Sequence, residues 1–152
     1  MTPTLYLTRN GLLEPLGQSQ VFAYLRGLSQ DHAITLITYE KPEDWADSAR
    51  MTRAREACEQ HGIRWLPQMF RRKPRVIAPA FNMMRMVWLL LREVRAGRAN
   101  LIHVRSYIPA AAALLVHRMT GVPFIFDMRA LWPDELITAG RLRRGSLLHR
   151  AI

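Results

Sequence analysis

Short β-branched and apolar segments alternate along this sequence with longer segments of helical periodicity, and this alternation limits the possible folds more than any other feature. The predicted strands are residues 4–8, 33–39, 63–70, 100–104 and 124–126. Because helical segments lie between the strands, we expect the strands to run parallel and to be joined by right-handed crossovers. The sequence therefore predicts an α/β fold with a doubly wound parallel sheet in the strand order 3-2-1-4-5.

The predicted helices are residues 18–29, 42–60, 77–94 and 109–119, and a further helix is expected to begin near Ser146. Pro67 has no backbone N–H to donate, so the strand at 63–70 is expected near an edge of the sheet. The run Phe124-Ile125-Phe126 shows no alternation with polar residues, which predicts a strand buried on both faces.

Length and composition indicate a single domain, residues 1–152, in a cytoplasmic protein. Hydrophobic residues make up 49% of the 152 residues, which is enough for one substantial core. Cys58 is the single cysteine, so an internal disulfide is excluded, and nothing in the sequence resembles a metal site. We recognise no signal peptide and no apolar run of about 18 residues that would span a membrane.

The net charge of +10 is concentrated in one part of the chain. Residues 71–98 carry eight basic side chains and one acidic side chain, whereas residues 1–70 carry seven and eight. Four of the basic residues, Arg71, Arg72, Lys73 and Arg75, come directly before the helix at 77–94. Such a field attracts nucleic acid, an anionic membrane or a phosphorylated ligand, and its sign alone does not choose among them.

The helix at 77–94 has two apolar stripes, although one is enough to pack on a sheet. One stripe consists of Ala80, Met84, Val87, Leu91 and Val94, and the other of Met83, Met86 and Leu90. A spare apolar stripe beside a basic cluster resembles the surface that holds monotopic proteins on an anionic membrane, here the inner face of the plasma membrane. In the alternative interpretation, the helix is buried between the sheet and another domain, with methionines filling the core.

Polar clusters follow three of the predicted strands. Arg9-Asn10-Gly11 follows strand one, Arg105-Ser106-Tyr107 follows strand four, and Asp127-Met128-Arg129 follows strand five. These strands are neighbours in the predicted order, and ligands of such sheets bind outside the carboxyl ends of the strands. We therefore expect a basic site with one carboxylate, in which arginines bind an anion and Asp127 accepts a hydroxyl proton.

The loop after strand one leads into a helix, and backbone N–H groups at a helix start favour an anion. The candidates for a phosphate-facing role are therefore Gly11, Gly17, Gln18 and Ser19. The loop nevertheless lacks the spacing of the known phosphate-binding glycine motifs, and Pro15 removes one donor, so the residues alone favour an ordinary loop. His103 lies in the predicted strand four, at residues 100–104, and is expected to be a core histidine.

Three stretches of this sequence resemble the amino-terminal, Rossmann-like domain of family 4 glycosyltransferases of the GT-B type. They are NGLLEPLGQSQVFAYLRGLS, LIHVRSYIPAAAALL and GVPFIFDMRALWPDE, and the resemblance covers nearly the whole chain. It implies retaining transfer of a sugar from a nucleotide-sugar donor to a glycan or lipid-linked acceptor, in a cleft between two domains. In such enzymes the amino-terminal domain shapes the acceptor side, and the loop after strand one approaches the donor phosphates.

On this resemblance, Asp127 is the candidate catalytic residue, as base or orienter. The candidate acceptor- or phosphate-binding residues are Asn10, Gly11, Gly17, Gln18, Arg105, Ser106, Tyr107, Arg129, Trp132 and Glu135. No cofactor is implied beyond the nucleotide sugar as co-substrate. Many family members carry a histidine after strand four or five, where this sequence has Arg105 and Asp127 to Arg129.

The carboxyl-terminal domain, which in this family binds the nucleotide sugar, has no counterpart in the 152 residues. We therefore expect the chain to be an amino-terminal fragment, either a truncated form or one half of a split enzyme, and to be inactive by itself. Two other classes stay open: a basic nucleic-acid-binding domain and a non-catalytic α/β interaction module. Binding of nucleic acid is not expected, because the sequence shows no recognisable nucleic-acid module and no aromatic residues within the basic run 71–75.

Overall fold

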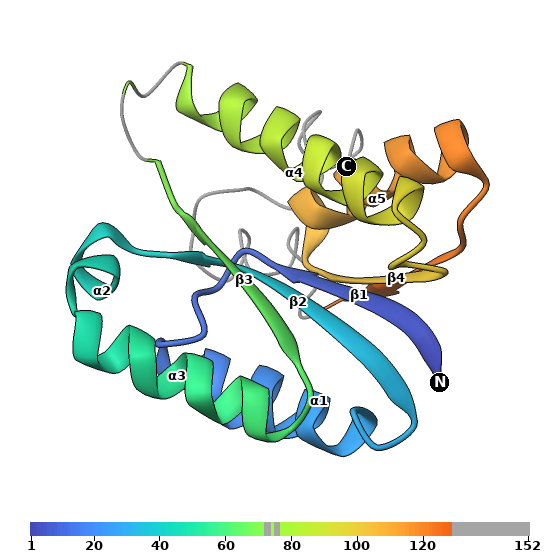
Figure 1. Ribbon diagram of the computed structural model, residues 1–152. Coiled ribbons are helices and arrows are strands. Elements are labelled where there is room, and N and C mark those ends of the chain that lie inside the picture. The colour runs from blue at the N-terminus through green and yellow to red at the C-terminus, as the bar shows by residue number, and fades with distance from the viewer. Residues whose placement is uncertain (72–73, 75–76, 129–152) are drawn as a thin grey trace, which may run out of the picture.

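The computed structural model describes residues 1–71, 74 and 77–128 (Figure 1). Within them the elements are β1 (Thr2–Thr8), η1 (Gly17–Phe22), α1 (Ala23–Leu28), β2 (His32–Glu40), α2 (Pro42–Ala46), α3 (Ser48–Gln60), β3 (Arg64–Met69), α4 (Ala78–Arg95), β4 (Leu101–Arg105), α5 (Tyr107–Thr120) and β5 (Phe124–Asp127). The sheet has the order β3-β2-β1-β4-β5, and each neighbouring pair is parallel. This confirms the predicted fold class, the strand order and the edge position of the strand that contains Pro67.

Helices cover both faces of the sheet (Figure 1). On one face, Leu5 and Leu7 of β1 pack in a cluster that includes residues of α4 and α5, such as Met86 and Ala112. On the other face, Tyr6 belongs to a cluster with residues of η1, α1 and α3. Adjacent residues of β1 thus point to opposite faces of the sheet and pack in two different cores. This is the reason that the central strands are mainly apolar on both faces.

Two predicted helices have a different local structure. The segment predicted as one helix at 42–60 is broken at Asp47, whose Oδ1 accepts a hydrogen bond of 3.0 Å from the Arg50 N–H and caps α3. An N-cap residue has non-helical backbone angles, so the capping aspartate ends α2 and starts α3. The helix predicted at 18–29 begins as the π-helical segment η1, and such segments are rare enough that residue periodicity does not reveal them.

The prediction that β5 is buried on both faces is wrong. Ile125 is 47% exposed and Phe126 is 38% exposed, whereas Phe124 is partly buried and packs against the core on the α4–α5 side. The reason is position: within the described residues, β5 is an edge strand that pairs only with β4. A run of three apolar residues looks the same in sequence at an edge and at the centre of a sheet.

The face of α4 that packs on the sheet is the stripe containing Met83, Met86 and Leu90. Met86 and Leu90 are fully buried, and Leu89 joins them. In the other predicted stripe, Val87, Leu91 and Val94 are partly buried and pack against the same core. Only its first two members, Ala80 and Met84, are exposed, so the prediction of a spare apolar stripe at these positions is wrong.

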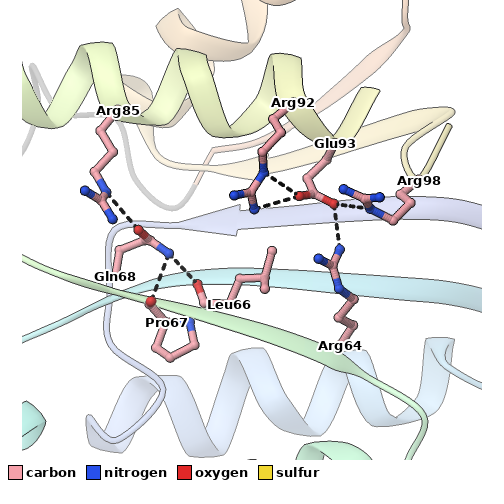
Figure 2. Close-up of polar contacts among 8 residues, drawn as sticks. All are labelled: Arg64, Leu66, Pro67, Gln68, Arg85, Arg92, Glu93 and Arg98. Carbon is pink, nitrogen blue, oxygen red and sulfur yellow. Dashed lines mark hydrogen bonds and ion pairs between the residues drawn. The ribbon is translucent and has the colours of Figure 1, made fainter. Parts of the chain in front are cut away.

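A buried carboxylate joins α4 to the edge strand β3 (Figure 2). Glu93 is fully buried and accepts hydrogen bonds from Arg64 (2.6 Å), Arg92 (2.8 Å) and Arg98 (2.7 Å). Burial alone would raise the pKa of Glu93, but the hydrogen bonds from Arg98, Arg64 and Arg92 lower it to about 2. Nearer the amino-terminal end of α4, Arg85 donates a hydrogen bond to Gln68 of β3 at 2.8 Å (Figure 2). The helix is therefore held to the strand at two places.

We predict that Glu93→Gln lowers the free energy of unfolding by about 2 kcal/mol near neutral pH, because charge-assisted hydrogen bonds become neutral ones. The folded-state pKa lies below the ordinary value of 4.5, so this contribution is complete above pH 4.5 and is lost as the pH falls towards about 2. Urea denaturation across this range measures the effect. The control is Glu56→Gln, on an exposed position of α3; an equal loss in both variants would contradict the assignment.

Candidate functional site

The carboxyl ends of three adjacent strands bring the predicted polar residues together. Thr8 of β1 is in register with Arg105 of β4, which is in register with Asp127 of β5. The Arg105 Nε and the Asp127 Oδ2 atoms are 3.8 Å apart, and the Ser106 N–H donates to the Asp127 carbonyl at 3.2 Å. Side-chain exposure is 40% for Asp127 and 14% for Arg105, so the carboxylate is open to a ligand while the guanidinium is held in place.

The surroundings of Arg105 fix its orientation. Its Nη2 donates to the side-chain oxygen of Gln20 in η1. Beneath it lies Tyr6, whose pKa is raised to about 12 by burial, against the lowering effect of Arg105. An arginine with these contacts presents a fixed positive charge at the sheet edge.

His103 lies on the same face of β4 as Arg105 and is buried, as its strand position predicted. Its ring packs edge-on against Tyr6 and Tyr24, at centroid distances of 4.7 Å and 5.8 Å. Burial lowers the pKa of His103, although the charge of Asp127 opposes this effect. The imidazole therefore favours its neutral form next to the Arg105–Asp127 pair.

Ser106 has a strained backbone at the point where β4 leads into α5. Its φ of 81° and ψ of 160° lie in a region that is occupied almost only by glycine. The hydrogen bond from its N–H to the Asp127 carbonyl holds it there. Such strain concentrates at binding sites, which is a signal that the sequence does not contain.

A buried carboxylate, missed by the sequence analysis, organises the loop after β1. Glu40 is fully buried and accepts hydrogen bonds from the N–H groups of Leu12 (2.7 Å) and Leu13 (3.3 Å). The Thr38 hydroxyl also donates to it at 2.6 Å. The only sequence signal was a glutamate at the end of an otherwise apolar, β-branched strand.

The two predicted loop glycines are packed tightly. A Cβ atom on Gly11 would lie 2.5 Å from the Glu40 Oε2, and one on Gly17 would lie 2.1 Å from the Gly11 carbonyl oxygen. Gln18 donates from its Nε2 to the Leu12 carbonyl at 2.8 Å and braces the same loop. The N–H group of Gly11 faces the Glu14 carboxylate at 3.3 Å. These loop amides thus bind carboxylates of the chain itself.

Asn10 and Ser106 line one open pocket of about 290 Å³ at this edge, which we call the Tyr39 pocket. Its lining residues are Arg9, Asn10, Glu14, Tyr39, Lys41, Phe70 and Ser106. A larger hollow of about 480 Å³ is lined by residues such as Gly27 and His61, near the ends of α1 and α3, and contains none of the predicted site residues. The Tyr39 pocket is therefore one concave part of the candidate site.

Of the other predicted site residues, Tyr107 does not line the Tyr39 pocket, and some lie outside the described part of the chain. The Tyr107 ring is exposed and packs edge-on against Phe126, 5.4 Å between centroids. Arg129, Trp132 and Glu135 lie outside the described residues, as do Arg72, Lys73 and Arg75 of the basic run. Within residues 1–71, 74 and 77–128, no group of His, Cys, Asp and Glu side chains could hold a metal ion.

Residues 18–152 match the sequence family described as glycosyl transferase 4-like domain. The chain belongs to this family. The match covers most of the 152 residues and confirms the resemblance to the amino-terminal domain of family 4 glycosyltransferases. Among curated proteins, no sequence matches this glycosyl transferase 4-like chain significantly.

Two solved structures share the fold of this glycosyl transferase 4-like domain. A glycosyltransferase from Rickettsia africae is 15% identical with a TM-score of 0.54, and the match covers 91% of this chain but 33% of that chain. The C-terminal domain of a hydrogenase from Pyrococcus furiosus is 14% identical with a TM-score of 0.59, covering 84% of this chain and 91% of the other. At such low identities the likeness concerns the fold alone, and the family match carries the assignment.

We predict that Gly17→Ala destabilises the domain by about 2 kcal/mol, because the added methyl group meets backbone atoms that cannot move aside. Gly27→Ala is the matched control: a Cβ there meets nothing within 4 Å, and alanine in a helix stabilises by about 0.5–1 kcal/mol relative to glycine. Thermal unfolding followed by circular dichroism measures both. Equal midpoints for the two variants would show that the loop tolerates the methyl group.

Proposed function

We propose that this domain binds the sugar acceptor of a retaining glycosyltransferase, which transfers a sugar from a nucleotide sugar to a glycan or lipid-linked acceptor. The observation that carries the proposal is the Arg105–Asp127 pair, 3.8 Å apart at the carboxyl ends of β4 and β5, in a chain of the glycosyl transferase 4-like family. The position fits the rule that open α/β sheets bind ligands outside the carboxyl ends of their strands.

The side chains suit an acceptor with several hydroxyl groups. Asp127 accepts a hydrogen bond from the reacting hydroxyl and orients its oxygen, while Arg105 holds the carboxylate in position. Asn10 and Ser106 supply further polar groups from the two neighbouring loops. In the transfer, the bond from the anomeric carbon to the nucleotide phosphate breaks and a bond to the acceptor oxygen forms. The nucleoside diphosphate leaves, and the hydroxyl proton passes to Asp127.

The nucleotide sugar is held mainly by a second domain in this proposal. The chain spans 33% of the Rickettsia africae glycosyltransferase, which leaves room in such proteins for a donor-binding half. Residues 1–152 alone then lack most of the donor site. No cofactor beyond the nucleotide sugar is needed.

We predict that residues 1–152 alone transfer no sugar from radiolabelled UDP-glucose, UDP-galactose or GDP-mannose to extracted glycolipid acceptors. In the protein as the cell makes it, Asp127→Asn is expected to lower kcat about 100-fold, because the reacting hydroxyl loses its acceptor. The control is Asp31→Asn, on an exposed turn away from the carboxyl ends of the strands. Turnover by residues 1–152 alone, or full activity of Asp127→Asn, would overturn the proposal.

We also propose that the outer face of α4 rests on an anionic membrane surface. Ile77, Phe81, Met84 and Trp88 are exposed at helical spacing and form what we call the outer stripe. Three of them, Ile77, Phe81 and Trp88, were not among the stripes predicted from sequence. Trp88 is 56% exposed, which is unusual for so large an apolar side chain on a water-facing helix.

Arginines accompany this apolar surface. The guanidinium of Arg71 lies 4.6 Å from the ring centroid of Phe81, and that of Arg92 lies 5.0 Å from the ring centroid of Trp88. Apolar side chains flanked by cations favour the boundary of an anionic bilayer. In the described part of the chain, no helix is long and apolar enough to cross a membrane, so the proposed contact lies at the surface.

Vesicle flotation tests the membrane contact. We expect the chain to float with vesicles containing phosphatidylglycerol, to float poorly with pure phosphatidylcholine, and to be released by salt. Trp88→Ser should weaken binding about tenfold, because an interfacial indole is lost. Trp45→Ser, the same change on α2, is the control. Equal absence of the chain from both kinds of vesicle would remove the proposal.

A further inference from the structure

The Tyr39 pocket is lined by a buried tyrosine whose hydroxyl group has no hydrogen-bond partner among the residues that the structure describes. Tyr39 is 1% exposed, and its Oη atom has no hydrogen-bond partner within residues 1–71, 74 and 77–128. Buried hydroxyl groups are nearly always paired, since an unpaired one costs free energy. Burial raises the pKa of Tyr39, although the charge of Arg85 opposes this, so the group stays an O–H donor at physiological pH. A ligand that fills the pocket with an acceptor atom would satisfy it.

Two cations lie in the same pocket. Arg9 lines the pocket with its guanidinium 5.3 Å from the ring centroid of Phe70, and it forms no ion pair with a carboxylate of residues 1–71, 74 and 77–128. Lys41 lies 3.6 Å from Glu14, whose carboxylate also accepts from the Gly11 N–H. The pocket thus carries two positive charges and one negative charge, together with the hydroxyl donor.

This combination points to a specific ligand chemistry. A phosphate or carboxylate oxygen accepts hydrogen bonds and carries the charge that Arg9 and Lys41 attract, whereas a neutral sugar hydroxyl offers no such charge. The geometry points to the Tyr39 pocket as the binding site for an anionic group, phosphate or carboxylate, that the sugar acceptor carries beside its reacting hydroxyl.

The pocket and the Arg105–Asp127 pair meet at Ser106. Ser106 lines the pocket, and its N–H donates to the Asp127 carbonyl at 3.2 Å. An acceptor anchored by its anionic group in the pocket would therefore extend toward the carboxylate of Asp127. This inference rests on the proposed function for the identity of the ligand, but the binding of an anion by the pocket does not depend on transfer activity.

Titration of the ¹⁵N-labelled chain tests the inference with four probes: glucose 1-phosphate, glucuronic acid, glucose and UDP. We expect glucose 1-phosphate and glucuronic acid to shift the amide signals of Asn10 and Ser106, and glucose to bind at least about tenfold more weakly, which corresponds to the loss of one charge-assisted hydrogen bond. Stronger binding of the phosphate or of the carboxylate identifies which group the acceptor carries. Shifts with UDP alone would assign the pocket to the donor and overturn the inference.

Tyr39→Phe removes the hydroxyl group and keeps the shape of the side chain. We expect it to weaken glucose 1-phosphate binding about tenfold while the unfolding midpoint stays the same or rises, because a buried unpaired group is removed. A lower midpoint with unchanged binding would show that the hydroxyl is structural and would overturn the inference. Lys41→Gln should weaken binding and reduce its salt dependence, and Arg118→Gln, an exposed cation on α5, is its control.

Anion binding and sugar transfer can fail separately. If anions bind at the pocket but the protein as the cell makes it transfers no sugar, the pocket stands and the proposed function falls. If sugar is transferred but glucose 1-phosphate and glucuronic acid bind no better than glucose, the proposed function stands and the inference falls.

Discussion

The candidate site depends on the buried carboxylate of Glu40, at the end of β2. Its oxygens accept from two backbone amides of the loop after β1 and from the Thr38 hydroxyl, and Thr38 in turn accepts from the Trp65 indole at 2.8 Å. This chain of contacts joins β3, β2 and the loop. A buried carboxylate must satisfy its oxygens, so the loop has little freedom to move away from it. The positions of Arg9 and Asn10, which precede the bonded amides, follow from this constraint.

The fixed loop and the strained Ser106 together indicate that the polar groups at this edge of the sheet are preorganised. Gly11 and Gly17 permit the close packing, and the register of β1, β4 and β5 sets Arg105 beside Asp127. Groups that are held before the ligand arrives need not be ordered on binding, which is the way a rigid scaffold favours a reaction. Glu93 and its three arginines hold α4 on β3, so the helix with the outer stripe has a fixed position on the sheet.

For this domain, a shared fold does not indicate a shared function. The domain of a hydrogenase and a glycosyltransferase share its fold at about the same low identity, so the fold by itself does not select a reaction. The family match over residues 18–152 assigns the chain to the glycosyl transferase 4-like family, which the fold alone does not do.

The sequence by itself determined the sheet and its order, because the alternation of strand and helix periodicity leaves few topologies that obey the crossover rules. It also placed Asn10, Arg105, Ser106 and Asp127 at one edge, since parallel strands end on the same side. Tertiary structure alone decided that Glu40 binds the loop and that Ile125 and Phe126 of β5 are exposed. It also decided that the Tyr39 hydroxyl has no partner among the described residues. The physical reason is that periodicity is a local property. Burial and hydrogen-bond pairing depend on residues distant in the chain, such as Leu12 and Glu40, and become fixed only when the elements pack.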